Sequence, residues 1–199
     1  MESTKLEEKA RAYVISDIVT DEGVAELLNR IQEYDKTTFL HSINVAHIVA
    51  QILALDKTKT DIAIEVVKGA LLHDIGKTKI PKKILNKQTS LTPEDYEIIK
   101  QHSQLGMRLV EDEYPYLLTP IVKDIILHHH ESPGGNGYPD KLQEIAPFTE
   151  LVSIVDKYDA MTAKRCYGNR YPSNYIILFL MEQGLNKDYI ALLNKCESK

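Results

Sequence analysis

The chain has 199 residues, of which 43% are hydrophobic and 27% are charged, and its formal net charge is −5 at pH 7. This length corresponds to one domain, or to one domain with a short extension, and the hydrophobic fraction can supply a core. The acidic balance argues against binding to nucleic acid polymers, because that function leaves a basic footprint.

Residues 1–20 are expected to be an N-terminal extension, and residues 21–199 to form one helical domain. The longest apolar run, Tyr175–Met181, is far too short to span a bilayer, and no signal peptide is recognised. Two cysteines, Cys166 and Cys196, make no disulfide framework and are expected to be reduced. We therefore expect a cytoplasmic protein without a membrane partner.

Apolar residues recur at helical spacing from the first part of the domain onward. Asp21 is an N-cap candidate for a helix that runs to about Tyr34, and the next helix is expected over about residues 38–54. His41 lies near the start of that second helix and His47 in its middle. These two histidines are about 240° apart around the helix and cannot serve one site, so His47 is interpreted as a surface or hydrogen-bonded core residue.

A third helix is expected over about residues 60–73, and it ends in the adjacent pair His73 and Asp74. A glycine and a proline soon after the pair terminate this helix and leave Lys77 on a loop. Imidazole and carboxylate side by side suit a divalent metal ion, but an isolated pair of this kind is also typical of a buried, hydrogen-bonded pair.

The second half of the domain is expected to be helical around one long loop. Thr92 followed by a proline and two acids predicts the start of a helix that carries His102 and runs to about Val110. Further helices are expected over about residues 116–130, 148–163, 173–183 and 187–195, and a glycine- and proline-rich loop over 132–147. No alternation of period two appears, so the sequence predicts an all-α helical bundle.

Five of the seven histidines lie at the ends of expected elements or beside Asp, Glu or Gly, and two acids lie on expected helices where they could face the same cleft. Scattered over five helices, such residues can converge in the middle of a bundle, as in di-metal helical proteins. About seven nitrogen and oxygen ligands are more than one zinc ion needs, and two ions fit better. A set without thiolate favours iron or manganese, with zinc, nickel or magnesium as alternatives. The candidates are His41, His73, Asp74, His102, His129, His130 and Asp156.

Four sequence blocks between about residues 39 and 170 resemble, in the same order, the motifs of HD-GYP domains. The first block contains His73 and Asp74 and continues through Lys87, and the second surrounds His102. The third runs from His129-His130-Glu131 through Gly137-Tyr138-Pro139, and the fourth runs from Val155 to Tyr167. HD-GYP domains form a branch of the HD superfamily of metal-dependent phosphohydrolases.

The resemblance implies a helical bundle with a bi- or trinuclear metal centre that hydrolyses cyclic di-GMP to pGpG or GMP through a metal-bridging hydroxide. All seven candidates above match metal ligands of the family by position, with Asp74 as the bridge between ions. Asp74 and Lys77 are thus the expected catalytic residues. Lys77 and Arg165 match residues that hold the substrate phosphate, and the loop that borders the substrate is matched by Gly137, Tyr138 and Pro139.

Each of these three assignments has a plainer alternative. Lys77 could complement a helix dipole, Arg165 could form a surface salt bridge, and Tyr138 could pack only the loop. His128 precedes the two-histidine motif, and counting back from Glu131 selects its two neighbours as the ligands instead.

Two positions depart from the family pattern. Members with three metals carry a glutamate four residues before the first histidine, where this chain has Thr37, so two metals are expected. Gly134 stands where the family usually has aspartate, which bears on the conformation of the loop and on the recognition of substrate or partner.

Two other functions stay open beside cyclic di-GMP hydrolysis. One is a phosphohydrolase or phosphodiesterase for another nucleotide or cyclic dinucleotide, although the Gly-Tyr-Pro loop marks a narrower branch. The other is a weakly active signalling module that binds a nucleotide or a partner protein. The partners expected are a cyclic dinucleotide and a signalling protein or a second copy of the chain.

Overall fold

The computed structural model describes residues 16–55, 62–162 and 171–197, and this part of the chain contains helices and turns but no strand. The predicted all-α fold is confirmed. In order, the elements are α2 (Glu22–Tyr34), α3 (Lys36–Leu55), α4 (Ala63–Leu72), the 3-10 helix η2 (Ile75–Lys79), α5 (Lys82–Leu85), α6 (Pro93–Lys100), α7 (His102–Glu113), the 3-10 helix η3 (Pro115–Leu117), α8 (Pro120–His128), α9 (Pro147–Thr162), α10 (Ser173–Glu182) and α11 (Lys187–Glu197).

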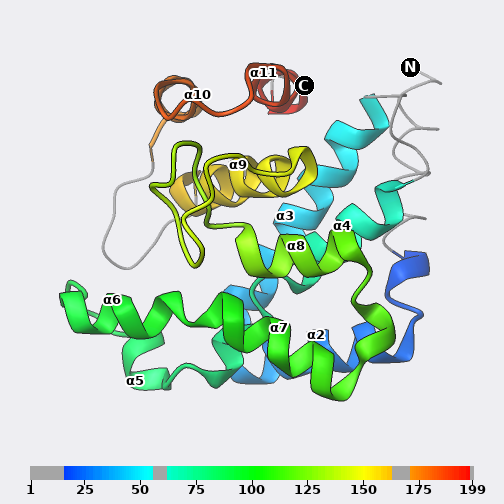
Figure 1. Ribbon diagram of the computed structural model, residues 1–199. Coiled ribbons are helices and arrows are strands. Elements are labelled where there is room, and N and C mark those ends of the chain that lie inside the picture. The colour runs from blue at the N-terminus through cyan, green and yellow to red at the C-terminus, as the bar shows by residue number, and fades with distance from the viewer. Residues whose placement is uncertain (1–15, 56–61, 163–170, 198–199) are drawn as a thin grey trace.

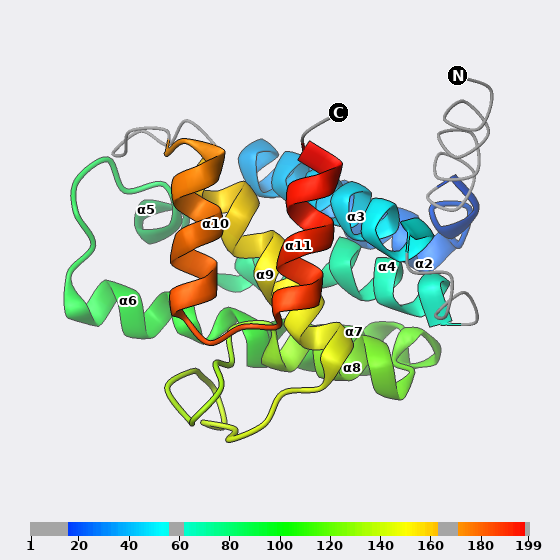
Figure 2. The same ribbon diagram turned by 90° about the horizontal axis from the view of Figure 1, so that it is seen from above.

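The helices form a layered bundle with α3 and α4 at its centre (Figure 1). Helix α3 packs against α2, α4, α9 and α11, and α4 also packs against α8 and α9. Helices α10 and α11 lie side by side across α9 on the outside of the bundle (Figure 2). Fully buried aliphatic side chains fill the space between these layers, among them Val45, Val49, Val66, Leu71, Ile125 and Ile154. Their burial removes apolar surface from water and stabilises the bundle.

Two glycines let backbones approach each other closely next to the His73-Asp74 pair. A Cβ on Gly76 would lie 1.8 Å from the carbonyl oxygen of His102 and 2.5 Å from the backbone nitrogen of Gly106. No other residue fits at such a distance, so Gly76 allows η2 to pack directly against α7. This contact brings the end of α4 next to the start of α7.

The helix starts follow the capping residues that the sequence contains. Asp21 accepts hydrogen bonds from the backbone of α2, and Thr92 forms a capping box with Asp95 at α6, as predicted. Thr119 caps α8, which therefore begins later than the predicted residue 116. Residues Pro115–Leu117, directly before it, form the 3-10 helix η3 instead.

Two further predictions were wrong. The single helix predicted from Thr92 to Val110 is two helices, because the chain turns at Gln101. This turn separates α6, which has no buried residue, from α7, whose first residue His102 is fully buried. Lys77 lies within the 3-10 helix η2 and not on an irregular loop.

Among the described helices, α3 alone is long and apolar enough to pass a composition test for a membrane span. The core helix of a water-soluble bundle passes the same test. Helix α3 packs against four other helices of the bundle.

Candidate metal centre

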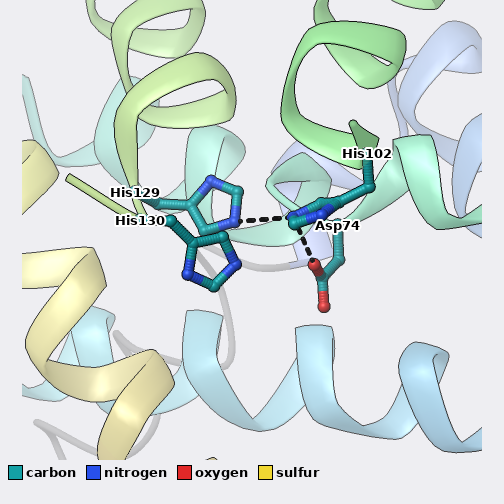
Figure 3. A group of neighbouring side chains, drawn as sticks. All are labelled: Asp74, His102, His129 and His130. Carbon is teal, nitrogen blue, oxygen red and sulfur yellow. Dashed lines mark hydrogen bonds and ion pairs between the residues drawn. The ribbon is translucent and has the colours of Figure 1, made fainter. Parts of the chain in front are cut away.

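The seven predicted ligands come from five parts of the fold. His41 lies in the second turn of α3, and Asp156 lies in α9. His73 and Asp74 follow α4, His102 begins α7, and His129 and His130 follow α8. Figure 3 shows Asp74 and three of the histidines pointing toward one another between these elements. The structure therefore brings together residues that are far apart in the sequence.

The donor atoms form two groups that share Asp74. Within each group, one nitrogen or carboxylate oxygen per residue lies within 4.8 Å of all the others. The first group contains Asp74, His102, His129 and His130, and the second contains His41, His73 and Asp74. A carboxylate common to two groups has the position of a bridge between two ions, as the family resemblance implied for Asp74.

Three of the histidines are oriented by their own helices. The Nδ1 atom of His73 lies 2.7 Å from the carbonyl oxygen of Ala70, and His102 makes the same contact with Ile99 at 2.7 Å. His129 Nδ1 lies 3.0 Å from the carbonyl oxygen of Ile125. A carbonyl can only accept, so each Nδ1 carries a proton, and in the neutral ring each Nε2 then presents a lone pair to the cluster.

These lone pairs lack donors in the described structure. The Nε2 atoms of His102 and His129 lie 3.2 Å apart, and neither has a proton to donate to the other. Among the buried side-chain atoms of the described residues, His73 Nε2, Asp74 Oδ1 and Ser42 Oγ, next to His41 in the sequence, have no hydrogen-bond partner. Buried polar atoms are normally paired, so this arrangement fits cations that would accept the lone pairs.

Burial keeps several of these histidines neutral. It lowers the pKa of His102 to about 4, although the carboxylate of Asp74 acts in the opposite direction. Burial likewise holds the pKa values of His129 and His130 well below the ordinary value for histidine. A neutral imidazole is the form that ligates a metal ion.

The carboxylate of Asp74 is ionised because its neighbours outweigh the effect of burial. Burial alone would raise the pKa of Asp74, but the charge of Lys77 and the contact with His73 outweigh it and hold the pKa well below the usual range. Lys77 Nζ lies 2.5 Å from Asp74 Oδ2. The site thus combines the charged carboxylate of Asp74, the neutral imidazoles of His102, His129 and His130, and the ammonium group of Lys77 at its edge.

His41 lies between two carboxylates of α9. Its Nε2 lies 2.9 Å from Asp156 Oδ1, and its Nδ1 lies 2.6 Å from Asp159 Oδ2. Burial lowers the pKa of His41, but the hydrogen bonds to both aspartates outweigh burial and raise the pKa to about 9. A cation that binds at Nε2 must therefore displace a proton, while Asp159 can keep its bond to Nδ1.

Asp156 lies outside the two groups but contacts one histidine of each. It lies 2.9 Å from His41 and 3.9 Å from Nδ1 of His130. The sequence analysis did not select Asp159 as a site residue. Its spacing could have identified it, because Asp156 and Asp159 are three residues apart and therefore lie on the same face of a helix.

The residues near Thr37 do not add a ligand in this structure. Thr37 is exposed, and Asp35 accepts a hydrogen bond from the backbone nitrogen of Thr38 at 2.7 Å, at the start of α3. His47 is exposed as well, and its Nε2 lies 2.9 Å from the Gln51 amide. The interpretation of His47 as a residue outside the site is confirmed.

The loop of residues 132–146, which follows the cluster, is held by the buried carboxylate of Glu131. The two carboxylate oxygens of Glu131 accept hydrogen bonds from the backbone nitrogens of Asp140, Lys141 and Leu142 at 2.7, 2.9 and 3.0 Å. Gly134 N bonds to Gln143 O at 3.1 Å and thereby pairs the two arms of the loop. The φ angle of Gly134 is +80°, which favours glycine and explains the absence of a larger residue there.

The tip of the loop lies against the cluster. The ring of Tyr138 stacks on His130 with centroids 4.8 Å apart, and Lys100 Nζ lies 5.7 Å from the Tyr138 ring centroid. Gly137 packs on the Glu131 backbone, where a Cβ would approach to 2.3 Å. Pro139 continues this tip, so the three residues predicted to border the substrate lie beside a predicted ligand. Arg165 lies outside the described residues.

His128 is not part of the cluster but of a network beside it. Its Nδ1 lies 2.7 Å from Asp124 Oδ1, and its Nε2 lies 3.0 Å from Asp140 Oδ2. The hydrogen bonds to Asp124 and Asp140 raise the pKa of His128 above its ordinary value. Both ring nitrogens are thus engaged, which agrees with the choice of its two neighbours as the predicted ligands.

Comparisons with known proteins identify the family of the chain. A family model described as "HD domain" matches residues 14–189. A protein of Thermotoga maritima named "Cyclic di-GMP phosphodiesterase" is 38% identical over 152 residues, which cover 75% of this chain and 41% of that protein. A protein of Vibrio cholerae named "3'3'-cGAMP-specific phosphodiesterase 2" is 30% identical over 167 residues, 81% of this chain and 31% of that protein.

The solved structure of Bd1817, an HDG"Y"P protein from Bdellovibrio bacteriovorus, aligns with a TM-score of 0.69 and 25% identity. The alignment covers 98% of this chain and 63% of that one. This chain spans less than half of the length of the two sequence relatives. The fold, the order of the motifs and the matched family model show that the chain belongs to the HD domain family, in its HD-GYP branch.

Proposed function

We propose that the chain is a metal-dependent phosphodiesterase that hydrolyses cyclic di-GMP to pGpG or GMP. The observation that carries this proposal is the pair of donor groups that share Asp74 and direct unpaired lone pairs toward one another. We propose two divalent cations there, iron or manganese. The proposed ligands are His41, His73, Asp74, His102, His129, His130 and Asp156.

Divalent cations supply Lewis acidity, which activates water and stabilises charge on phosphoryl oxygens. The chain's own residues would do the remaining work. Lys77, held by Asp74, presents an ammonium group that would neutralise the charge that develops on a phosphoryl oxygen. We propose the same role for the guanidinium of Arg165, which can bind a phosphate with two hydrogen bonds.

Tyr138 would form one wall of the substrate site. Its ring lies flat on His130, at the edge of the first donor group. A ring fixed in this way offers an apolar surface for a nucleotide and excludes water from one side of the cluster. Gly137 and Pro139 would complete the border of the site.

A second candidate substrate is 3'3'-cGAMP, because one relative with 30% identity carries that substrate in its name. The two dinucleotides share the phosphodiester that the cluster would cleave, and they differ in one base. Only turnover distinguishes them.

The test is turnover by the purified protein after metal removal and reloading with manganese or iron. Cyclic di-GMP, 3'3'-cGAMP and a small aryl phosphodiester are supplied in parallel, and the products are identified by mass spectrometry. We expect linear pGpG or GMP, about two metal equivalents per chain, and no product with Asp74→Asn. Cleavage of the aryl phosphodiester without cleavage of either dinucleotide would contradict the substrate class. Empty metal sites after reloading would favour a binding module.

A further inference from the structure

His128 connects two carboxylates from different parts of the fold. Its side chain is 15% exposed, and its two nitrogens face Asp124 on α8 and Asp140 in the 132–146 loop. Carboxylates only accept hydrogen bonds, so the ring donates from both nitrogens. Thr149 of α9 donates to the other oxygen of Asp124, which ties the same network to a third element.

Asp140 is held from a second side as well. Its backbone nitrogen donates to the buried Glu131 at 2.7 Å, while its carboxylate accepts from His128. Asp140 directly follows Pro139, and the backbone nitrogen of Tyr138 donates to His130 O at 3.3 Å. The position of Asp140 therefore sets the position of the loop tip that covers His130.

We propose that His128 is a positioning residue that fastens Asp140 to α8 and thereby holds Tyr138 in place as a wall of the substrate site. The proposal rests on the proposed function for its substrate, but the fastening itself is a property of the loop. The His128 side chain bonds to Asp124 and Asp140, and beyond Asp140 the loop tip contacts the predicted ligand His130 through the Tyr138 ring.

The expected size of the effect follows from the exposure of the partners. The Asp140 side chain is 52% exposed, so this bond is weaker than the buried contacts of Glu131. Loss of the bond is expected to raise the KM for a cyclic dinucleotide about fivefold, which corresponds to about 1 kcal/mol. Turnover at saturation and metal content are expected to stay unchanged, because the donor groups are untouched.

The first experiment compares His128→Ala, Asp140→Ala and the double variant with the wild type, all loaded with manganese. We expect each single variant to raise the KM for cyclic di-GMP about fivefold, and the double variant to be no worse than either. Asp140→Asn keeps an acceptor oxygen and should stay within about twofold of the wild type. Hydrolysis of a small aryl phosphodiester, which is too short to reach the loop, should not change. His47→Ala is the matched control on α3.

Several outcomes would overturn the proposal. An unchanged KM in His128→Ala would show that the bond does not position the loop. Effects of the single variants that multiply in the double variant would show that the two residues act separately. Equal losses on both substrates, or loss of metal, would place His128 in the metal centre.

A second measurement does not depend on activity. Amide hydrogen exchange of the full chain reports how often the backbone of Asp140, Lys141 and Leu142 opens. We expect exchange at these amides to accelerate about fivefold in His128→Ala and to stay unchanged in His47→Ala. Unchanged exchange in His128→Ala would contradict the fastening, whereas wild-type protein without turnover would contradict only the proposed function.

Discussion

The Nε2 atoms of His102 and His129 lie 3.2 Å apart, and the Nδ1 of each ring faces a backbone carbonyl. Two lone pairs at this distance repel each other until a cation lies between them. The folded chain is therefore expected to gain stability when a divalent cation binds.

We expect manganese at about one hundred times its Kd to stabilise the fold by about 2.7 kcal/mol. For a chain of this size, that gain corresponds to a rise in Tm of about 5–10 °C. Thermal unfolding of the metal-stripped and reloaded protein measures the shift. His47→Ala should show the full rise, and a Tm that does not respond to manganese or iron would contradict the assignment.

Lys77→Ala is expected to separate rate from metal binding. Lys77 contacts Asp74 at the edge of the cluster and supplies no ligand atom, so metal content should match that of the wild type. Loss of a positive charge at a phosphoryl oxygen should lower kcat by about 10²- to 10³-fold. Steady-state kinetics and metal analysis on the same sample measure both. Lys83→Ala, an exposed lysine on α5, is the control, and normal kcat in Lys77→Ala would show that its role is wrong.

Asp159→Asn is expected to weaken metal binding without removing a ligand. Asp159 accepts from His41 Nδ1 and so directs Nε2 toward the second donor group. Loss of such a supporting carboxylate commonly costs about 10- to 100-fold in metal affinity. Competition with a chromogenic chelator measures the affinity. Asp188→Asn changes an exposed aspartate on α11 and should bind metal as the wild type does; equal affinities of the two variants would remove Asp159 from the site.

Gly76→Ala is expected to destabilise the fold through a backbone clash. The added methyl group would meet His102 O at 1.8 Å, and the contact between η2 and α7 must open. Such overpacking costs about 3 kcal/mol. Urea unfolding measures the loss. Gly184→Ala is the matched control, because Gly184 has φ +71° with no atom within 4 Å and should lose only about 1 kcal/mol. Equal losses would mean that the close approach is unimportant.

The parts of the fold that the sequence predicts well depend on local interactions. Helix α2 begins after Asp21, as predicted, because an N-cap needs only the next three residues. The turn at Gln101 was missed, since it follows from the different burial of α6 and α7 in the assembled bundle. Tertiary packing decided this boundary, and no local signal opposes a continuous helix there.

The site likewise contains residues that the sequence identifies and residues that only the folded chain identifies. Motifs identify His73 and Asp74 as candidates, and the bridging position of Asp74 was implied by the family resemblance, whereas residue spacing alone does not place it between two donor groups. Asp159 could have been found from its spacing to Asp156 on α9. The roles of His128 and Asp140 could not have been found from the sequence, because the hydrogen bond between them depends on the path of the loop.

The contact between His41 and Asp156 joins residues that are 115 positions apart in the sequence. A cation held by both would act as a reversible cross-link that closes most of the domain into one loop. Closure of a long loop removes far more freedom from an unfolded chain than a local contact does. Every opening that separates α3 from α9 must then release the cation first, whereas fraying of α10 and α11 leaves it bound. Occupancy of the centre would therefore report on the integrity of the whole bundle.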